Sequence, residues 1–251
     1  MKRTTTILSA LVLLFTAGCV STQSGGLPAP APKAERLQAY LELARGHLSE
    51  GNSERAADPL ERAIALDPNS TEAHVLMAVL SESRGEDALA ERSYRTALRL
   101  DPKDPQALNN FGGFLLRTGR QEEALEHLRD AVKDPGYARR EFAYENLGVA
   151  ELSAGNRAAA KLAFARALGL DGDLPRANLE LAALEFDDGN IPIANDFYER
   201  FRDGARQSPR SLCLGIRLAR AMGDRDRLAS FTLALKNLYP SSAEAQQCTA
   251  S

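Results

Sequence analysis

The sequence predicts an all-α protein, most of which is a right-handed superhelical solenoid of six helix–turn–helix repeats. Three observations support this fold class. Glycines recur at intervals of 34, 34, 36, 34 and 34 residues, at Gly51, Gly85, Gly119, Gly155, Gly189 and Gly223. An alanine stands five residues after each of the first five glycines. Aromatic residues make up only 6% of the chain while alanine and leucine abound, which favours helices over sheets.

The first 18 residues have the features of a secretory signal peptide. Two basic residues precede the apolar run Ile7–Phe15, which is shorter than the roughly 20 residues that a membrane-spanning helix needs. The run leads through Thr16–Gly18 to Cys19, and small residues before a cysteine resemble a bacterial lipobox. We therefore expect cleavage before Cys19 and acylation of its thiol and amine. The alternative is an ordinary signal peptide that contains a cysteine.

Residues 19–36 are expected to be a lipidated N-terminus and a tether. Serine and glycine are frequent after Cys19, and prolines alternate with alanines over Pro28–Pro32, where no helix can continue. Val20, rather than an aspartate, follows the cysteine and implies the outer membrane. The expected location is the periplasmic face of that membrane, where the chain would be lipid-anchored.

The repeats are expected to fill residues 37–242, with a tail at 243–251. The six units are 37–70, 71–104, 105–140, 141–174, 175–208 and 209–242. Seven residues before each of the first five glycines stands a small residue, which lets two antiparallel helices approach closely: Ala44, Ala78, Gly112, Gly148 and Ala182. A glycine accommodates the left-handed conformation that ends the first helix of a pair. This pattern resembles the tetratricopeptide repeat.

Charge and motifs argue against several classes of function. Basic and acidic residues number 31 and 34, so there is no overall attraction to nucleic acid. The sequence contains no phosphate-binding loop, nucleophile elbow or zinc-protease motif. With three histidines and three scattered cysteines, a conventional zinc site is not expected. We therefore expect no catalysis, no cofactor, no metal and no small-molecule substrate.

The expected binding site is the concave face, which the first helix of each repeat lines. Helical counting places these residues on it: Leu41, Arg45, Leu48, Val75, Val79, Asn109, Gly113, Leu116, Glu145, Val149 and Leu152. This apolar stripe with a few polar groups suits the apolar side of a partner's amphipathic helix. The alternative is that neighbouring helices of the array cover part of the stripe.

The C-terminal part of the array is basic. Nine basic residues stand against five acidic ones between Asp196 and Pro240. Such a patch suits an acidic protein, lipid headgroups or the cell-wall polymer, and the alternative is a solvated surface whose charges pair with one another.

Two cysteines in this region, Cys213 and Cys248, lie 35 residues apart, close to one repeat period. Neighbouring helices can therefore bring them together in an oxidising compartment. A disulfide that caps the array and two separate thiols both remain open.

Five segments indicate a closer relationship: GNSERAADPL at 51–60, LNNFGGFL at 108–115, YENLG at 144–148, SLCLGIRLAR at 211–220 and LKNLYP at 235–240. In this order, behind a lipoprotein signal, they resemble the PilF/PilW family of type IV pilus biogenesis lipoproteins. The resemblance implies a pilotin, which holds PilQ-type secretin subunits at the outer membrane and supports their assembly into multimers. Cys19 would be the anchor and the concave groove the client site. Two alternatives remain: a scaffold of another envelope machine, such as barrel assembly, and an adaptor for peptidoglycan hydrolases.

Overall fold

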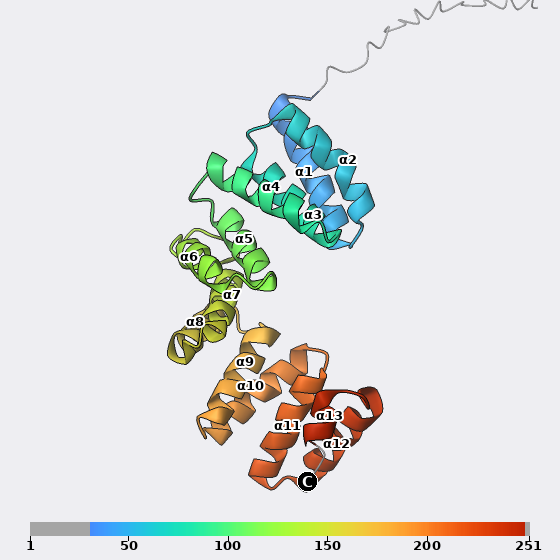
Figure 1. The fold of residues 1–251 in the computed structure, drawn as a ribbon, viewed down its shortest axis with the longest axis vertical. Coiled ribbons are helices and arrows are strands. Elements are labelled where there is room, and N and C mark those ends of the chain that lie inside the picture. The colour runs from blue at the N-terminus through green and yellow to red at the C-terminus, as the bar shows by residue number, and fades with distance from the viewer. Residues whose placement is uncertain (1–30, 249–251) are drawn as a thin grey trace, which may run out of the picture. The chain divides into compact units, whose positions relative to one another are not determined.

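The computed structural model describes residues 31–248, which form helical pairs and contain no strand. In Figure 1 the pairs follow one another in chain order, from α1 and α2 to α11 and α12. The first helices of the pairs are α1 (Lys33–Ser49), α3 (Thr71–Ser83), α5 (Pro105–Arg117), α7 (Arg140–Ser153), α9 (Pro175–Asp187) and α11 (Pro209–Met222). The second helices are α2 (Ser53–Leu66), α4 (Asp87–Leu100), α6 (Gln121–Ala131), α8 (Arg157–Leu170), α10 (Ile191–Gly204) and α12 (Arg225–Leu238).

The helices contact one another in the order typical of a solenoid. Each first helix packs against its own second helix and against the first helix of the next pair, and each second helix up to α10 packs against the first helix that follows. Within residues 31–248 no two second helices pack backbone against backbone, although Arg227 of α12 reaches Glu199 of α10 with its side chain. The first helices therefore line one face, which we call the inner face, and the second helices lie behind it.

The six glycines that define the period end the first helices as predicted. All six have positive φ angles, between 71° and 80°. This left-handed conformation is open to glycine at little cost, so the chain can turn sharply from the first helix into the second.

The seam between the two helices of a pair is closely packed. The bulky residue on the second helix is at most 1% exposed in five repeats: Leu60, Tyr94, Leu128, Phe164 and Tyr198. A Cβ added to Gly112 would lie 2.5 Å from Leu128 Cγ, and one added to Gly148 would lie 2.6 Å from Phe164 Cδ1. Glycine is therefore required at these two crossings because any side chain would overlap its neighbour.

One expected boundary is wrong. Helix α1 begins at Lys33, so the segment up to residue 36 is not all tether. Lys33, Ala34, Glu35 and Arg36 are good helix formers, and Pro32 interrupts a helix only on its own N-terminal side. The expected tail contains helix α13 (Ala243–Cys248), which forms because Ala245 and Cys248 are buried against the last pair. The signal peptide, Cys19 and residues 20–30 of the tether lie outside the described residues.

Candidate functional site

Part of the predicted groove is core. Leu41 and Val75 are each 1% exposed, and Asn109 is 6% exposed. Leu41 packs in one apolar cluster with residues of α3, and Val75 in one with residues of α5. The prediction that these three side chains line the groove is wrong, because the position ten residues before each glycine faces the next first helix. Glu145, at the equivalent position of α7, is likewise buried, at 9% exposure.

The remaining predicted groove residues reach the surface of the inner face. Six of them are half-buried: Leu48, Val79, Gly113, Leu116, Val149 and Leu152. Arg45 is exposed and forms an ion pair with Glu72 of α3. The inner face is thus mixed, with aliphatic side chains at its centre and a paired charge towards its N-terminal end.

A pocket of about 400 Å³ opens in the inner face where α5, α7 and α9 meet. Its lining residues are Gly113, Leu116, Arg117, Asn146, Val149, Ser153 and Arg176. We call it the inner pocket.

Three of the residues that line the inner pocket, Gly113, Leu116 and Val149, were predicted from the sequence, and the other four were not. Arg117, Asn146 and Ser153 lie three or four positions from Gly113 or Val149, so extending the stripe by one helical turn would have found them. Arg176 was missed as a groove residue because the stripe was not continued into α9.

A buried amide orients one side of the inner pocket. Asn146 Nδ2 donates to Asn109 Oδ1 at 3.0 Å, and Asn109 Nδ2 donates to the Tyr137 hydroxyl at 3.4 Å. The side-chain carbonyl oxygen of Asn146 has no hydrogen-bond partner among residues 31–248. Asn109 is therefore a positioning residue behind the pocket rather than a part of its lining.

The two arginines of the inner pocket differ in their partners. Arg117 donates to Glu82 at 2.6 Å and to Asp87 at 3.4 Å, and its guanidinium lies 5.2 Å from the Phe114 ring centroid. The hydrogen bond that Arg117 donates to Glu82 raises the pKa of Arg117. Arg176, exposed at the start of α9, has no ion-pair partner within the described part of the chain. This pocket therefore contains one arginine without a direct ion pair, although its charge acts on the carboxylate of Glu145.

The start of α9 is held by a carboxylate from the preceding repeat. Leu174, the residue before the helix, supplies no side-chain cap. Glu145 Oε1 of α7 instead accepts from the Ala177 backbone N–H at 3.0 Å. Glu145 is only 9% exposed, and this burial raises its pKa, although the hydrogen bond from Ala177 and the charge of Arg176 oppose the shift. Glu145 thus positions α9, and with it Arg176, relative to α7.

The basic C-terminal region is neutralised only in part: four of its nine basic residues form ion pairs, whereas Arg200, Arg206, Arg220, Arg225 and Lys236 form none within residues 31–248. Arg210 donates to both oxygens of Glu180, at 2.5 and 2.7 Å. Arg217 donates to Asp187 at 3.1 Å and lies 4.3 Å from the Phe186 ring centroid. Arg227 forms an ion pair with Glu199. These partners stand on the preceding repeat, so the excess of basic residues in the sequence does not translate into an equally basic surface.

The last repeat is covalently joined to α13. A disulfide links Cys213 of α11 to Cys248, with a Cα–Cα distance of 5.6 Å. Arg220 also donates to the Cys248 backbone carbonyl at 3.3 Å. Together these contacts hold α13 where the first helix of a further repeat would pack.

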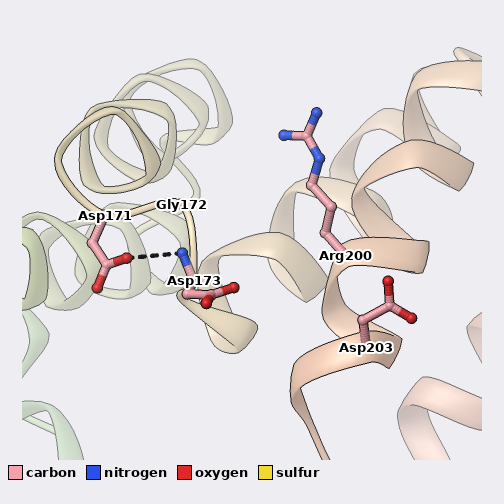
Figure 2. Close-up of a pocket in the computed structure, with 5 residues that line it drawn as sticks. All are labelled: Asp171, Gly172, Asp173, Arg200 and Asp203. Carbon is pink, nitrogen blue, oxygen red and sulfur yellow. Dashed lines mark hydrogen bonds between the residues drawn. The ribbon is translucent and has the colours of Figure 1, made fainter.

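A second pocket, of about 500 Å³, lies beside the loop that joins α8 to α9. Figure 2 shows Asp171 and Asp173 of this loop on one side and Arg200 and Asp203 of α10 on the other. Asp171 Oδ1 accepts from the Asp173 backbone N–H at 2.9 Å, an ordinary turn of the loop.

Residues 31–248 contain no cluster of three or more histidine, cysteine, aspartate or glutamate side chains suited to a metal ion. Nor does any helix in this range have the length and apolar character needed to cross a membrane.

The fold and its inner face define a tetratricopeptide repeat protein. Family models described as "Tetratricopeptide repeat" match residues 37–80 and 82–138. The chain is 39% identical over 246 residues to the "Type IV pilus assembly protein PilF" of Pseudomonas aeruginosa, covering 96% of this chain and 98% of that protein. It therefore belongs to the PilF/PilW family of type IV pilus biogenesis proteins, and the resemblance found in the sequence is confirmed.

Solved structures agree with this assignment. The structure from the functional characterisation of Pseudomonas aeruginosa PilF superimposes with a TM-score of 0.84 at 41% identity, covering 87% of this chain and 98% of that one. The crystal structure of PilW, described as a widely conserved type IV pilus biogenesis factor, has a TM-score of 0.73 at 24% identity and covers 86% and 99% of the two chains. The second likeness supports the fold alone.

Proposed function

We propose that this protein is a pilotin of the type IV pilus. In this proposal it is an outer-membrane lipoprotein that binds secretin subunits and promotes their localisation and assembly into multimers. The observation that carries the proposal is the 39% identity to a type IV pilus assembly protein along 96% of the chain. Cys19 is the lipid anchor, and the inner face is the client site.

The inner face supports a binding role. The inner pocket has apolar walls from Leu116 and Val149 and a charged Arg176 that forms no direct ion pair within residues 31–248. Such a mixture suits recognition of a polypeptide. The function requires no chemical step, only binding and delivery. Modest affinity suffices, since anchoring both molecules to one membrane raises their effective concentration.

The rival role as an adaptor for peptidoglycan hydrolases loses part of its support. It rested on the basic C-terminal region, where Arg210 and Arg217 are paired with Glu180 and Asp187. No observation in the described structure specifically favours barrel assembly.

The test is an immunoblot of outer-membrane fractions for heat-resistant secretin multimers. Four strains are compared: wild type, a deletion, Cys19→Ala and the matched control Ser21→Ala. We expect the deletion to lose the multimers, Cys19→Ala to displace the protein and its secretin from the outer membrane, and Ser21→Ala to behave as wild type. Multimers of unchanged amount and location in all four strains would refute the pilotin role.

A further inference from the structure

We propose that the inner pocket binds an extended segment of the partner in which an acidic side chain stands beside an aliphatic one. This inference rests on the proposed function, because it takes the partner to be a secretin subunit. It goes beyond that function by naming the site and the chemistry of the bound segment. Four features of the pocket carry it.

The first feature is the open space at Gly113. A Cβ added there would meet only Asn146 Nδ2, at 3.7 Å, an ordinary van der Waals distance. The neighbouring Gly112, in contrast, is required by its contact with Leu128. Glycine inside a helix costs about 1 kcal/mol relative to alanine. Packing within the protein does not explain this cost at Gly113, whereas close approach of a partner's backbone does.

The second feature is an oriented amide beside that space. Asn109 fixes the amide of Asn146, whose carbonyl oxygen lacks a partner among the described residues. This oxygen can accept a backbone N–H from a bound chain. A helix would have few such groups to offer because its own hydrogen bonds engage them, whereas an extended chain exposes them along its length. The amide therefore favours an extended segment over the amphipathic helix that the sequence suggested.

The third feature is the apolar part of the lining. Leu116 and Val149 come from adjacent first helices and are partly exposed to the pocket. An aliphatic side chain placed between them removes its own surface and theirs from water. This contact requires a hydrophobic residue in the bound segment.

The fourth feature is charge. Arg117 already forms ion pairs with Glu82 and Asp87, whereas Arg176 forms no direct ion pair in residues 31–248 and acts on the Glu145 carboxylate only through its charge. An aspartate or glutamate of the bound segment would supply a direct ion-pair partner through charge-assisted hydrogen bonds. The pocket thus selects one carboxylate next to one aliphatic side chain.

The test uses the full-length chain in detergent and fluorescence anisotropy. The probes are overlapping, labelled 15-residue peptides that cover the secretin encoded in the same genome. We expect a bound peptide with an acidic residue beside Leu, Ile or Val. Arg176→Gln should weaken its binding at least tenfold and flatten the salt dependence, and Gly113→Leu should abolish it. Arg92→Gln, which changes an exposed arginine of α4 that has no ion-pair partner there, is the matched control and should have no effect.

A charge exchange provides the specific readout. Arg176→Glu should restore binding to the same peptide when its acidic residue is changed to lysine. Failure of every secretin peptide to bind, or binding that is equal in wild type, Arg176→Gln and Gly113→Leu, would overturn the inference. If Gly113→Leu loses the helical circular dichroism signal and is therefore unfolded, the Arg176 variants still test whether the inner pocket binds the peptide.

The outcome for the pocket can be separated from the outcome for the function. Multimers that are lost in the deletion strain but kept in Arg176→Gln and Gly113→Leu would refute the pocket and leave the pilotin role standing. Multimers that survive deletion would refute the pilotin role, whatever the peptides do.

Discussion

The middle and the last repeats carry arginines on the inner face, but they use them differently. In the middle, Arg176 has no ion-pair partner in the described structure and belongs to a pocket of about 400 Å³. In the last repeats, Arg210 and Arg217 are held by Glu180 and Asp187, and a disulfide joins Cys213 to α13. In the middle Arg176 thus stays free of a direct ion pair, whereas at the C-terminal end Arg210 and Arg217 join neighbouring repeats.

The difference shows that in a repeat protein residues almost one repeat period apart in the sequence can form ion pairs. Two arginine–carboxylate pairs of the last repeats, Arg210 with Glu180 and Arg217 with Asp187, join residues 30 positions apart. A count of charges in a local window cannot detect such pairs because the partner stands almost one period earlier. Whether an arginine has a partner in the preceding repeat therefore says more about the charge of the surface than the local count of basic residues does.

The largest expected effect tests the role of the disulfide at the C-terminal end. Cys213→Ser opens a covalent loop of 35 residues, and chain-entropy arguments assign such a loop roughly 3–4 kcal/mol. We expect urea unfolding followed by circular dichroism to show this loss of stability in Cys213→Ser. Cys248→Ser and reduced wild type should match it, and the double variant should lose nothing further. Equal stability of oxidised and reduced wild type would show that noncovalent contacts alone hold α13.

The next effect separates the two faces of α5. Gly112→Ala places a methyl group against Leu128, and overpacking of this kind typically costs about 1–3 kcal/mol. Gly113→Ala has room for its methyl group and should gain roughly 0.5–1 kcal/mol from helix propensity. Thermal unfolding of the two variants measures the contrast. A loss of stability in Gly113→Ala would mean that the helix, not a partner, needs glycine there.

A third pair of variants compares paired and unpaired arginines directly. Arg210→Gln removes both hydrogen bonds to Glu180, which is only 8% exposed. Because Arg210 itself is partly solvated, we expect a loss of about 1–2 kcal/mol. Arg176→Gln should stay within about 0.5 kcal/mol of wild type. Urea unfolding at low and high salt checks both values, and an equally destabilised Arg176→Gln would remove the contrast between the two regions.

Much of the fold is predictable from the sequence, because period and residue size determine it. The glycines at the turns, the alanines at the crossings and the bulky residues behind them all have the roles expected from their spacing. Helix α13 was missed because Ala243–Cys248 is a six-residue segment without a periodic pattern, and tertiary contacts stabilise it.

The site was predicted only in part. Helical counting finds Gly113, Leu116 and Val149 but misplaces Leu41 and Val75, since a small rotation of a helix moves a row of side chains from the surface into the contact with the next helix. The role of Asn109 depends on the hydrogen bond from Asn146, 37 residues away. No sequence pattern specified this bond.

The smallest effect concerns the carboxylates next to these arginines. Glu180 is compensated by Arg210, whereas buried Glu145 only accepts a hydrogen bond from Ala177. Burial raises the pKa of Glu145, so between its unfolded pKa of about 4.3 and the raised value the folded state binds more protons than the unfolded one. The contribution of Glu145 to stability therefore grows as the pH falls through this window and is lost as the pH rises above it.

Glu145→Gln keeps an oxygen for the Ala177 N–H and removes the charge. We expect the variant to equal or exceed wild type by up to about 1 kcal/mol at pH 7 and to lose this advantage towards pH 4.5. Melting curves of both proteins at the two pH values measure the difference. The lowered pKa values of exposed carboxylates such as Asp188 affect both proteins alike and cancel in the comparison. A variant that is clearly less stable at pH 7 would mean that the attraction of the Glu145 charge to the start of α9 and to Arg176 outweighs its burial.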